Sequence, residues 1–539
     1  MLLPFTKNSF VAVALLACVL CCALKENVWA VTLVGDSTRS RAERLLREGE
    51  FENAEKLFRE LLVKDAHDNA ARLGLSFALL KQRNLLDAYD HAARVLASDP
   101  LSPRAHALLG SAVLASGDFH QAIEEFRTAL SFKETEALAI AGLAMVDFYE
   151  NRLSECVNGL HRAIALDGNE PDYLFSLGQA AARSQHYREA ADAYERFLQI
   201  APRTDADRRA RIRGLIDFLR YLGAQKPLYQ VQSGERVSVP FEAIGERPVF
   251  KVYVNGAKEP LRFVLDTGSG MSVVSEEAAR RLNLRPVARG GMARAVGGGG
   301  RFEIVYGFLP FLELGETDTA RIENVPVYIR RFYNDKEKID GYIGLSALKG
   351  FVVVVDYGAR NMTLLRGRAM KDDAVIATQT KTAVEIPVRT TSSGFLSGEV
   401  RLDGVERPLS FVVDTGASVS VLSESLVARE TEVDRYAEGA RLRVYGAAGI
   451  SENIRTLLLP SLVFGAYQQK NLNAVVLDLG PINETAGFEQ TGIIGANFLR
   501  NFRVTFDLRR GVVRLEPLNN VPTSTQTSQP AQTGGTSEP

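Results

Sequence analysis

Two segments decide the fold: Phe-Val-Leu-Asp-Thr-Gly-Ser-Gly-Met-Ser-Val-Val-Ser at residues 263–275, and Phe-Val-Val-Asp-Thr-Gly-Ala-Ser-Val-Ser-Val-Leu-Ser at residues 411–423. They lie 148 residues apart and agree at most positions. Each starts with a short apolar run, which is typical of a buried strand, and then turns at an Asp-Thr-Gly triplet. The repetition indicates that the second half of the chain contains two copies of one unit.

The similarity between the copies continues on both sides of these segments. Upstream, Val252-Tyr-Val-Asn-Gly256 matches Val400-Arg-Leu-Asp-Gly404 at the same spacing. Downstream, Gly341-Tyr-Ile-Gly-Leu-Ser-Ala-Leu348 matches Gly492-Ile-Ile-Gly-Ala-Asn-Phe-Leu499 at a spacing of 151 residues. Short β-rich runs alternate with glycine-rich turns throughout this half, so the helical period is lost. We therefore predict two all-β lobes, at residues 228–370 and 376–518.

Each copy resembles a lobe of the retropepsin-like and pepsin-like aspartic proteases. In that family an apolar strand ends in Asp-Thr-Gly, and an apolar-apolar-Gly turn follows later; the matching turns here are Tyr342-Ile343-Gly344 and Ile493-Ile494-Gly495. The resemblance implies a duplicated acid-protease fold in which the two lobes form a pseudo-dimer with one composite active site. The sequence leaves open the alternative that each lobe pairs with its counterpart in another chain.

The resemblance implies that Asp266 and Asp414 are the catalytic pair. Two carboxylates a few ångströms apart share one proton, because like charges that close cannot both ionise cheaply. The ionised member then acts as general base toward a water molecule, and the protonated member acts as general acid. The residues expected to support the two loops are Thr267, Gly268 and Ser269 in the first copy, and Thr415, Gly416 and Ala417 in the second. By the family pattern the threonines hydrogen-bond across the pseudo-twofold axis, and the glycines permit a tight turn.

The two copies differ at the position after each triplet, where Ser269 stands opposite Ala417. A hydroxyl at that position can donate a hydrogen bond to its own aspartate and stabilise the charged form, whereas a methyl group cannot. The sequence therefore suggests the hypothesis that Asp266 is the ionised base and Asp414 the proton donor.

Two glycine-rich hairpins are the candidate lids over this site. They are expected around residues 294–301 and 443–450, with Gly297, Gly298, Tyr445 and Gly446 at or near their tips. A run of glycines suits a mobile tip that excludes water when it closes over a substrate. The alternative is a pair of ordinary flexible hairpins without a role in closure.

The first half of the chain repeats every 34 residues between residues 35 and 204. A small residue recurs at Ala54, Ala88, Ala122, Cys156 and Ala190, and a large one at Phe58, Phe126 and Tyr194. The pattern resembles the tetratricopeptide (TPR) family, in which antiparallel helix pairs stack into a solenoid. The resemblance implies five all-α repeats whose concave face could hold a protein partner. Residues 205–223 are predicted to form an amphipathic capping helix and a linker.

The two ends of the chain are expected to lie outside these domains. Residues 1–30 contain an apolar run, Phe10–Leu24, followed by Val28-Trp29-Ala30, which is typical of a cleaved signal peptide. The run is shorter than the roughly 20 residues of a membrane span. We therefore predict export to the periplasm or the extracellular space, with a retained anchor or lipid attachment at Cys18 as the alternatives. Contact with a membrane is expected only in those two cases. Residues 519–539 are rich in Thr, Ser, Gln, Pro and Gly and are predicted to be disordered.

Composition excludes several other classes of function. The formal net charge of −1 gives no reason to expect a nucleic-acid partner. Residues 224–539 contain no histidine and no cysteine, which excludes a Ser-His-Asp or Cys-His site and a zinc site with His or Cys ligands in this half. No phosphate-binding loop with its Lys-Ser/Thr ending is present. We therefore expect neither a cofactor nor a metal.

The leading hypothesis from the sequence is an aspartic endopeptidase that hydrolyses peptide bonds by activating water between Asp266 and Asp414. Its partners would be a protein or peptide substrate and a protein bound to the TPR repeats. The alternative is a scaffold protein whose protease-like lobes hold peptides without cutting them.

Overall fold

The computed structural model describes residues 37–518, except for residues 299, 335–336, 380–381 and 447–448. The predicted signal peptide and the predicted disordered tail both lie outside the described residues. Within residues 37–518, apart from those gaps, no helix is long and apolar enough to cross a membrane. The described residues form two compact units: one contains residues 37–114, 118–142 and 199–205, and the other contains residues 115–117, 143–198 and 206–518, apart from the gaps named above.

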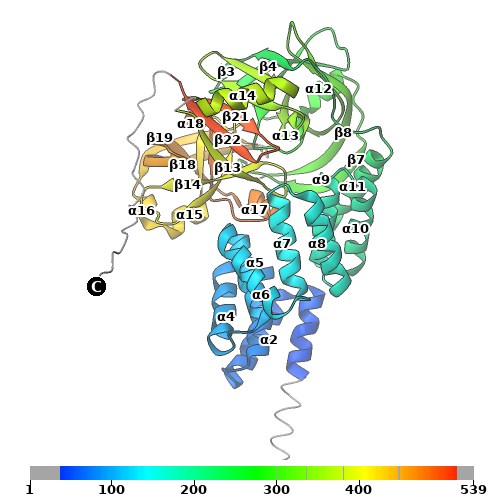
Figure 1. The fold of residues 1–539 in the computed structure, drawn as a ribbon, viewed down its shortest axis with the longest axis vertical. Coiled ribbons are helices and arrows are strands. Elements are labelled where there is room, and N and C mark those ends of the chain that lie inside the picture. The colour runs from blue at the N-terminus through cyan, green and yellow to red at the C-terminus, as the bar shows by residue number, and fades with distance from the viewer. Residues whose placement is uncertain (1–36, 299, 335–336, 380–381, 447–448, 519–539) are drawn as a thin grey trace, which may run out of the picture. The chain divides into compact units, whose positions relative to one another are not determined.

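Helices occupy the whole first part of the described chain (Figure 1). Residues 37–48 are helical. The helices that follow are α2 (Phe51–Lys64), α3 (Asn69–Lys81), α4 (Leu85–Ser98), α5 (Pro103–Ser116), α6 (Phe119–Phe132), α7 (Ala137–Tyr149), α8 (Leu153–Leu166), α9 (Pro171–Arg183) and α10 (Tyr187–Ile200). The second helix of each pair begins at residue 51, 85, 119, 153 or 187, which is the 34-residue period of the sequence. The predicted all-α repeat fold is confirmed.

The repeated small residue is what lets the helices of this part pack closely. Ala54, Ala88, Ala122, Cys156 and Ala190 all have 0% of their surface exposed. Burial raises the pKa of the Cys156 thiol to about 12, so this cysteine is a neutral, small apolar side chain. Glycines make room for the repeated large residue: a Cβ atom at Gly142 would overlap the ring of the fully buried Phe126.

Helix α11 (Ala206–Gly223) packs against both the repeats and the β region. On one side Arg209 donates a hydrogen bond of 2.6 Å to the carbonyl of Leu198 in α10. On the other side α11 lies along strand β7 (Ala288–Arg294), as Figure 1 shows. The two backbones nearly touch, because a Cβ atom on Gly214 would overlap the carbonyl oxygen of Arg289. The helix therefore does more than cap the repeats.

The β region begins with a 9-stranded sheet in the order β1-β9-β6-β10-β5-β4-β8-β7, with β3 paired to β4. Its strands are β1 (Gln230–Gln232), β3 (Glu242–Ile244), β4 (Arg247–Val254), β5 (Leu261–Asp266), β6 (Ser272–Ser275), β7, β8 (Arg301–Leu314), β9 (Ala320–Arg330) and β10 (Gly341–Gly344). The short helices α12 (Glu276–Arg281) and α13 (Leu345–Leu348) follow β6 and β10.

A 13-stranded sheet follows, in the order β17-β18-β19-β16-β20-β15-β14-β13-β22-β21-β11-β12-β2. Its strands are β2 (Arg236–Pro240), β11 (Val352–Asp356), β12 (Asn361–Leu365), β13 (Val384–Thr390), β14 (Leu396–Leu402), β15 (Leu409–Val413), β16 (Ser420–Ser423), β17 (Ala437–Gly446), β18 (Gly449–Phe464), β19 (Tyr467–Leu477), β20 (Gly492–Ile494), β21 (Phe502–Asp507) and β22 (Val512–Pro517). Its short helices are α15 (Glu424–Arg429), α16 (Thr431–Asp434), α17 (Gly480–Ala486) and α18 (Ala496–Leu499). The β4–β12 order of the first copy recurs as β14–β22, so the predicted duplication is confirmed.

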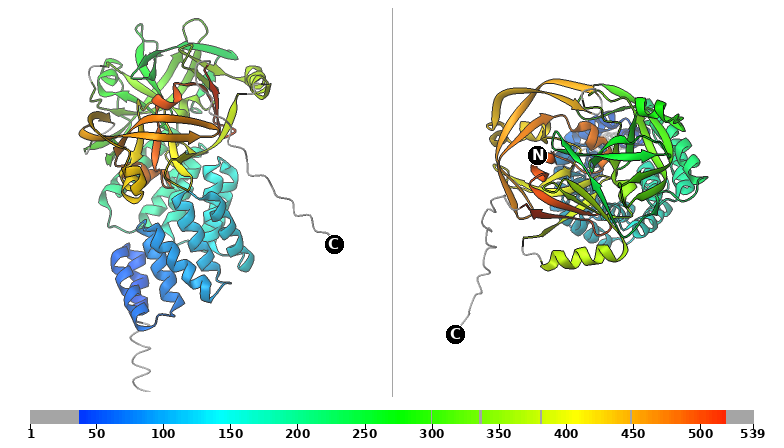
Figure 2. Two further views of the ribbon diagram at one scale, coloured as in Figure 1. Left: turned by 90° about the vertical axis from the view of Figure 1, so that its left-hand side faces the viewer. Right: turned by 90° about the horizontal axis from the view of Figure 1, so that it is seen from above.

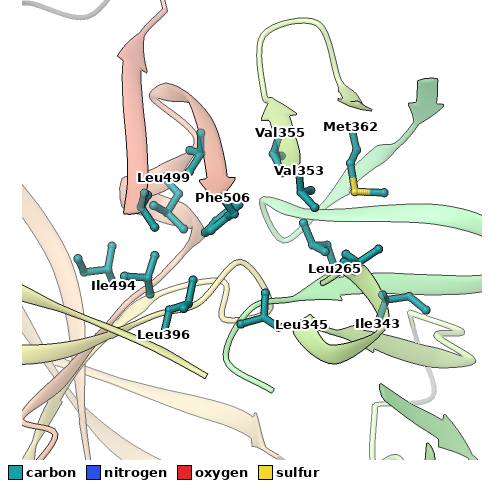
Figure 3. Packing of buried hydrophobic residues seen from close by; sticks show 14 of the residues in the cluster. Leu265, Ile343, Leu345, Val353, Val355, Met362, Leu396, Ile494, Leu499 and Phe506 are labelled. Carbon is teal, nitrogen blue, oxygen red and sulfur yellow. The ribbon is translucent and has the colours of Figure 1, made fainter. Parts of the chain in front are cut away.

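Strands from both copies join in the middle of this second sheet. Strand β11 of the first copy pairs antiparallel with β21 of the second, with Val353 opposite Phe506. Val355 and Met362 from the first copy and Leu499 and Phe506 from the second belong to one buried cluster (Figure 3). The two lobes therefore close on each other within one chain, which decides between the two pairings that the sequence left open.

The connection between the lobes is helical. Helix α14 (Gly367–Gln379) spans the segment where the sequence suggested only a short linker, and both views in Figure 2 show it on the outside of the β region. Asp373 fixes it there through a buried ion pair of 2.6 Å with Arg514 of β22. Breaking one partner of such a pair would strand a buried charge, so the helix is firmly attached to the second lobe.

Candidate active site

The two aspartates occupy equivalent places in the two lobes. Asp266 is the last residue of β5, and Asp414 comes directly after β15. Strand β10 pairs parallel with β5 and places Gly344 opposite Asp266, while β20 pairs parallel with β15 in the same way. The amide of Asp414 donates to the carbonyl of Ile494 at 3.0 Å. The structure therefore puts both apolar-apolar-Gly turns, with Ile343 and Ile494, directly beside the aspartate loops.

Each of these turns requires glycine because the neighbouring loop backbone lies against it. A Cβ atom on Gly344 would lie 2.6 Å from the carbonyl carbon of Met271, and one on Gly495 would lie 2.7 Å from that of Val419. Both distances are to backbone atoms, which cannot rotate away as a side chain can. This close approach holds each aspartate loop against its turn.

Two serines, which the sequence analysis missed, also hold each aspartate loop against its glycine turn. The amide of Gly344 donates to the hydroxyl of Ser272, and the amide of Gly495 donates to that of Ser420, both at 3.1 Å. Both serines are buried. A signal was available, because the two serines occupy the same position in the two repeated segments.

The threonines lock the two aspartate loops together. The hydroxyl of Thr267 donates to the carbonyl of Val413 at 2.7 Å and accepts the amide of Thr415 at 3.0 Å. In return, the hydroxyl of Thr415 donates to the carbonyl of Leu265 at 2.7 Å and accepts the amide of Thr267 at 3.3 Å. The structure thus places the two threonines in the reciprocal arrangement that the resemblance implied.

The two glycines of the triplets make space for the opposite carboxyl group. A Cβ atom on Gly268 would lie 2.5 Å from the carboxyl carbon of Asp414, and one on Gly416 would lie 3.0 Å from that of Asp266. The chain does turn tightly here, since the amide of Ser269 donates to the carbonyl of Asp266 at 3.3 Å. Neither glycine has a positive φ, so glycine is required at these positions by the space for the opposite carboxyl group. Because both glycines lack a side chain, the two carboxyl groups come within hydrogen-bonding distance of each other.

The surroundings make the two carboxyl groups unequal. Burial raises the pKa of Asp266, and the negative charge of Asp414 and the hydrogen bond to it raise that pKa further, well above its usual range. Burial also raises the pKa of Asp414, but the amide of Gly416, at 2.7 Å, and the hydrogen bond from Asp266 stabilise its charged form. The amide of Gly268, at 3.3 Å, and that of Ala417 add to this stabilisation. These surroundings favour the shared proton on Asp266 and the negative charge on Asp414.

The hypothesis that Ser269 stabilises an ionised Asp266 is wrong. The hydroxyl of Ser269 donates instead to the carbonyl of Met271 at 2.9 Å. Comparing the side chains of Ser269 and Ala417 could not show which aspartate is stabilised as a carboxylate. That stabilisation comes from backbone amides, which both copies possess.

The two candidate hairpins meet at their tips. Gly297 and Gly298 have positive φ values of 72° and 106°, and Cβ atoms on them would lie 2.7 Å from Cα of Gly446 and 2.6 Å from Cα of Gly449. The amide of Gly298 donates to the hydroxyl of Ser451 at 2.6 Å. Glycine is required at this crossing both by the backbone conformation and by the lack of space.

The first hairpin also reaches across to the second lobe. Val296 at its tip packs against the same buried cluster as Ala417 of the second aspartate loop. Arg294 forms an ion pair of 3.1 Å with Asp478, which follows β19. The side chain of Tyr445 in the second hairpin is 40% exposed. Within the described residues, no three side chains of His, Cys, Asp or Glu are placed to hold a metal ion.

Comparison with known families agrees with this geometry. The family model described as aspartyl protease matches residues 250–347 and 398–498, which carry the two aspartate loops and their glycine turns. Two tetratricopeptide repeat models match residues 45–112 and 171–204. The fold and site thus define a class of protein: a TPR stack followed by duplicated lobes of the aspartyl-protease type.

The solved structures that the chain resembles include other TPR proteins. TTC0263, a thermophilic TPR protein of Thermus thermophilus, is 19% identical over 34% of this chain and 98% of its own, with a TM-score of 0.29. MamA from Desulfovibrio magneticus is 20% identical over 31% of this chain and 94% of its own, with a TM-score of 0.23. Scores this low carry no argument beyond the local helical likeness. No curated protein matches the chain.

Proposed function

We propose that the protein is an aspartic endopeptidase. The observation that carries the proposal is the Asp266–Asp414 pair, in which one carboxyl group holds a proton and the other is stabilised as a carboxylate by backbone amides. General acid–base hydrolysis of an amide needs those two protonation states side by side. The reciprocal threonine bonds keep both groups in place without any help from a substrate.

The two groups divide the proposed reaction between them. Asp414 accepts a proton from a water molecule, whose oxygen attacks the carbonyl carbon of the peptide bond, while Asp266 gives its proton to the carbonyl oxygen. The tetrahedral diol then breaks its carbon–nitrogen bond as the nitrogen takes the proton held by Asp414 and Asp266 takes back a proton from one diol hydroxyl, which restores the starting state of both carboxyl groups. The products are a carboxyl group and an amine, and no covalent intermediate forms on the enzyme.

The test compares wild type with Asp266→Asn and Asp414→Asn in cleavage of a peptide library at several pH values. Each single variant is expected to lose about 100-fold to 10,000-fold in rate. An equimolar mixture of the two variants should stay inactive, because β11 and β21 close the pair within one chain. If wild type binds library peptides but cleaves none at any pH, the peptide-holding scaffold becomes the better description.

TPR repeats serve protein–protein interaction in general. For this chain we propose the narrower role that its repeats recruit the protein substrate or an adaptor for it. A chain that begins at Ala137 keeps the helices α7–α10, most of which belong to the same compact unit as the β region, and lacks the earlier repeats. It should then cleave short peptides as well as wild type but a folded protein substrate more slowly. Equal rates on both substrates would count against recruitment.

The location of the protein is a further part of the proposal. The apolar run Phe10–Leu24 and the Val28-Trp29-Ala30 sequence after it support export with cleavage after Ala30. Trp29 is the single tryptophan of the chain, so cleavage would leave a protein without tryptophan fluorescence. The intact mass and fluorescence spectrum of protein from each cell fraction would decide this, and a full-length mass in the cytoplasm alone would refute it.

A further inference from the structure

A cavity of about 440 Å³ lies in the first lobe beside the first hairpin. Its walls come from α12, from the hairpin strands β7 and β8, and from the end of β9 and the residues after it. Five arginines line it: Arg280, Arg289, Arg301, Arg330 and Arg331. Only two acidic residues, Glu276 and Glu303, line it as well. This cavity, the arginine pocket, is therefore strongly positive.

Two of the five arginines are already engaged by carboxylates. Arg289 forms an ion pair with Glu303, and Arg301 forms one with Asp207 of α11. These pairs fix the walls of the arginine pocket and neutralise part of its charge.

The arginines near the end of β9 are held by aromatic rings. The guanidinium of Arg330 lies 4.5 Å from the centre of the Phe302 ring, and that of Arg331 lies 5.6 Å from the centre of the Tyr333 ring. Stacking of this kind orients the guanidinium group. Within the part of the chain that the structure describes, neither Arg280 nor Arg331 has a carboxylate partner.

The arginine pocket lies within electrostatic reach of the catalytic pair. Arg330 stands opposite Ser275 where β9 pairs with β6, and β6 in turn pairs with β10 beside the first aspartate loop. Burial is the main cause of the raised pKa of Asp266, and the positive charge of Arg330 acts in the opposite direction. The strands of the first hairpin, one of the two candidate lids, also form a wall of the arginine pocket.

We infer that the arginine pocket is a specificity subsite that receives an acidic side chain of the substrate peptide. The inference rests on the proposed function and names the kind of substrate. A carboxylate can accept two parallel hydrogen bonds from a guanidinium, and lysine or an apolar side chain offers nothing of the kind. The volume of the cavity leaves room for a glutamate side chain together with water.

The experiment uses full-length wild type and a peptide series in which one position at a time carries Glu, Gln or Lys. At one position Glu is expected to exceed Gln in kcat/KM by roughly tenfold, the size of one charge-assisted hydrogen bond. Arg331→Gln should bring that ratio close to one, and Arg331→Glu should reverse it in favour of Lys. Arg368→Gln, on the exposed side of α14, is the matched control and should keep the wild-type ratio.

Three results would separate the inference from the proposed function. Cleavage by wild type without a Glu preference at any position, or the same ratio in Arg331→Gln and Arg368→Gln, would overturn the subsite and leave the protease in place. If wild type cleaves no peptide, the proposed function fails and binding is measured by fluorescence anisotropy with labelled Glu and Gln peptides. If the Glu peptide binds more tightly than the Gln peptide and Arg331→Gln abolishes this difference, the arginine pocket is still supported as a peptide-binding site. If the two peptides bind equally well, the arginine pocket is refuted together with the proposed function.

Discussion

Replacing Thr267 by alanine removes a single hydroxyl that serves both lobes. The carbonyl of Val413 loses its donor at 2.7 Å, and the amide of Thr415 loses its acceptor at 3.0 Å. Thr267 is 1% exposed and Thr415 is fully buried, so water cannot easily replace the lost partner. Each stranded buried polar group costs about 1–3 kcal/mol, which gives about 2–6 kcal/mol for the two groups in Thr267→Ala. Thr267→Ser keeps the hydroxyl and loses one methyl group, worth about 1 kcal/mol.

The assay for this variant is local, because global unfolding of a chain with several domains also reports on transitions that do not involve these loops. Hydrogen exchange measured by mass spectrometry on peptides that cover residues 411–423 reports on the amide of Thr415. Thr267→Ala should speed exchange in these peptides and lower kcat, since the loop that carries Asp414 loses a fixed point. Thr267→Ser should exchange nearly as wild type does. If the alanine and serine variants behave alike in exchange and in kcat, the hydroxyl does not hold the loops together, and the reasoning fails.

Three further predictions concern the same site. Gly344→Ala should destabilise the β region by about 1–3 kcal/mol because its Cβ would meet the backbone of Met271, whereas Gly439→Ala, with no atom within 4 Å, should leave the thermal transition unchanged. Asp266→Asn should be more stable than wild type at neutral pH and equal to it in acid. The pKa of Asp266 is raised in the folded protein, so wild type loses stability as pH rises through that pKa. The asparagine variant has no carboxyl group at this position and does not lose this stability. Denaturant unfolding across the pH range checks this, and a gap that fails to widen with pH contradicts it. Ser269→Ala should leave both limbs of the pH–rate profile in place, because its hydroxyl is bonded to a carbonyl and not to the aspartate.

Duplication is what made the fold and the catalytic pair predictable. A 34-residue period and a 148-residue offset place equivalent residues at equal intervals, so the helix pairs and the two aspartate loops could be read without any contact information. Ser272 and Ser420 lie at equivalent positions of the two repeated segments, so their shared role could have been predicted in the same way, but it was overlooked.

The remaining features depend on contacts between segments that share no pattern. The proton falls to Asp266 because backbone amides point at Asp414, and backbone amides leave no mark in a sequence. The arginine pocket collects residues from four separate elements between Arg280 and Arg331. Neither the crossing of the hairpin tips nor the packing of α11 on β7 follows from local periodicity, because only tertiary packing brings those segments together.

The packing of α11 against β7 makes the two lids mechanically unequal. The first lid strand is pinned along its backbone by a helix, with Arg211 donating to the carbonyl of Met292 at 3.0 Å, while the matching strand β17 is solvent-exposed over most of its length. Lifting the first lid means breaking a helix–strand interface, and lifting the second means breaking little beyond the contact at the tips. If the two hairpins act as lids, as the sequence suggests, β17–β18 would be the one that moves and β7–β8 the one that stays fixed.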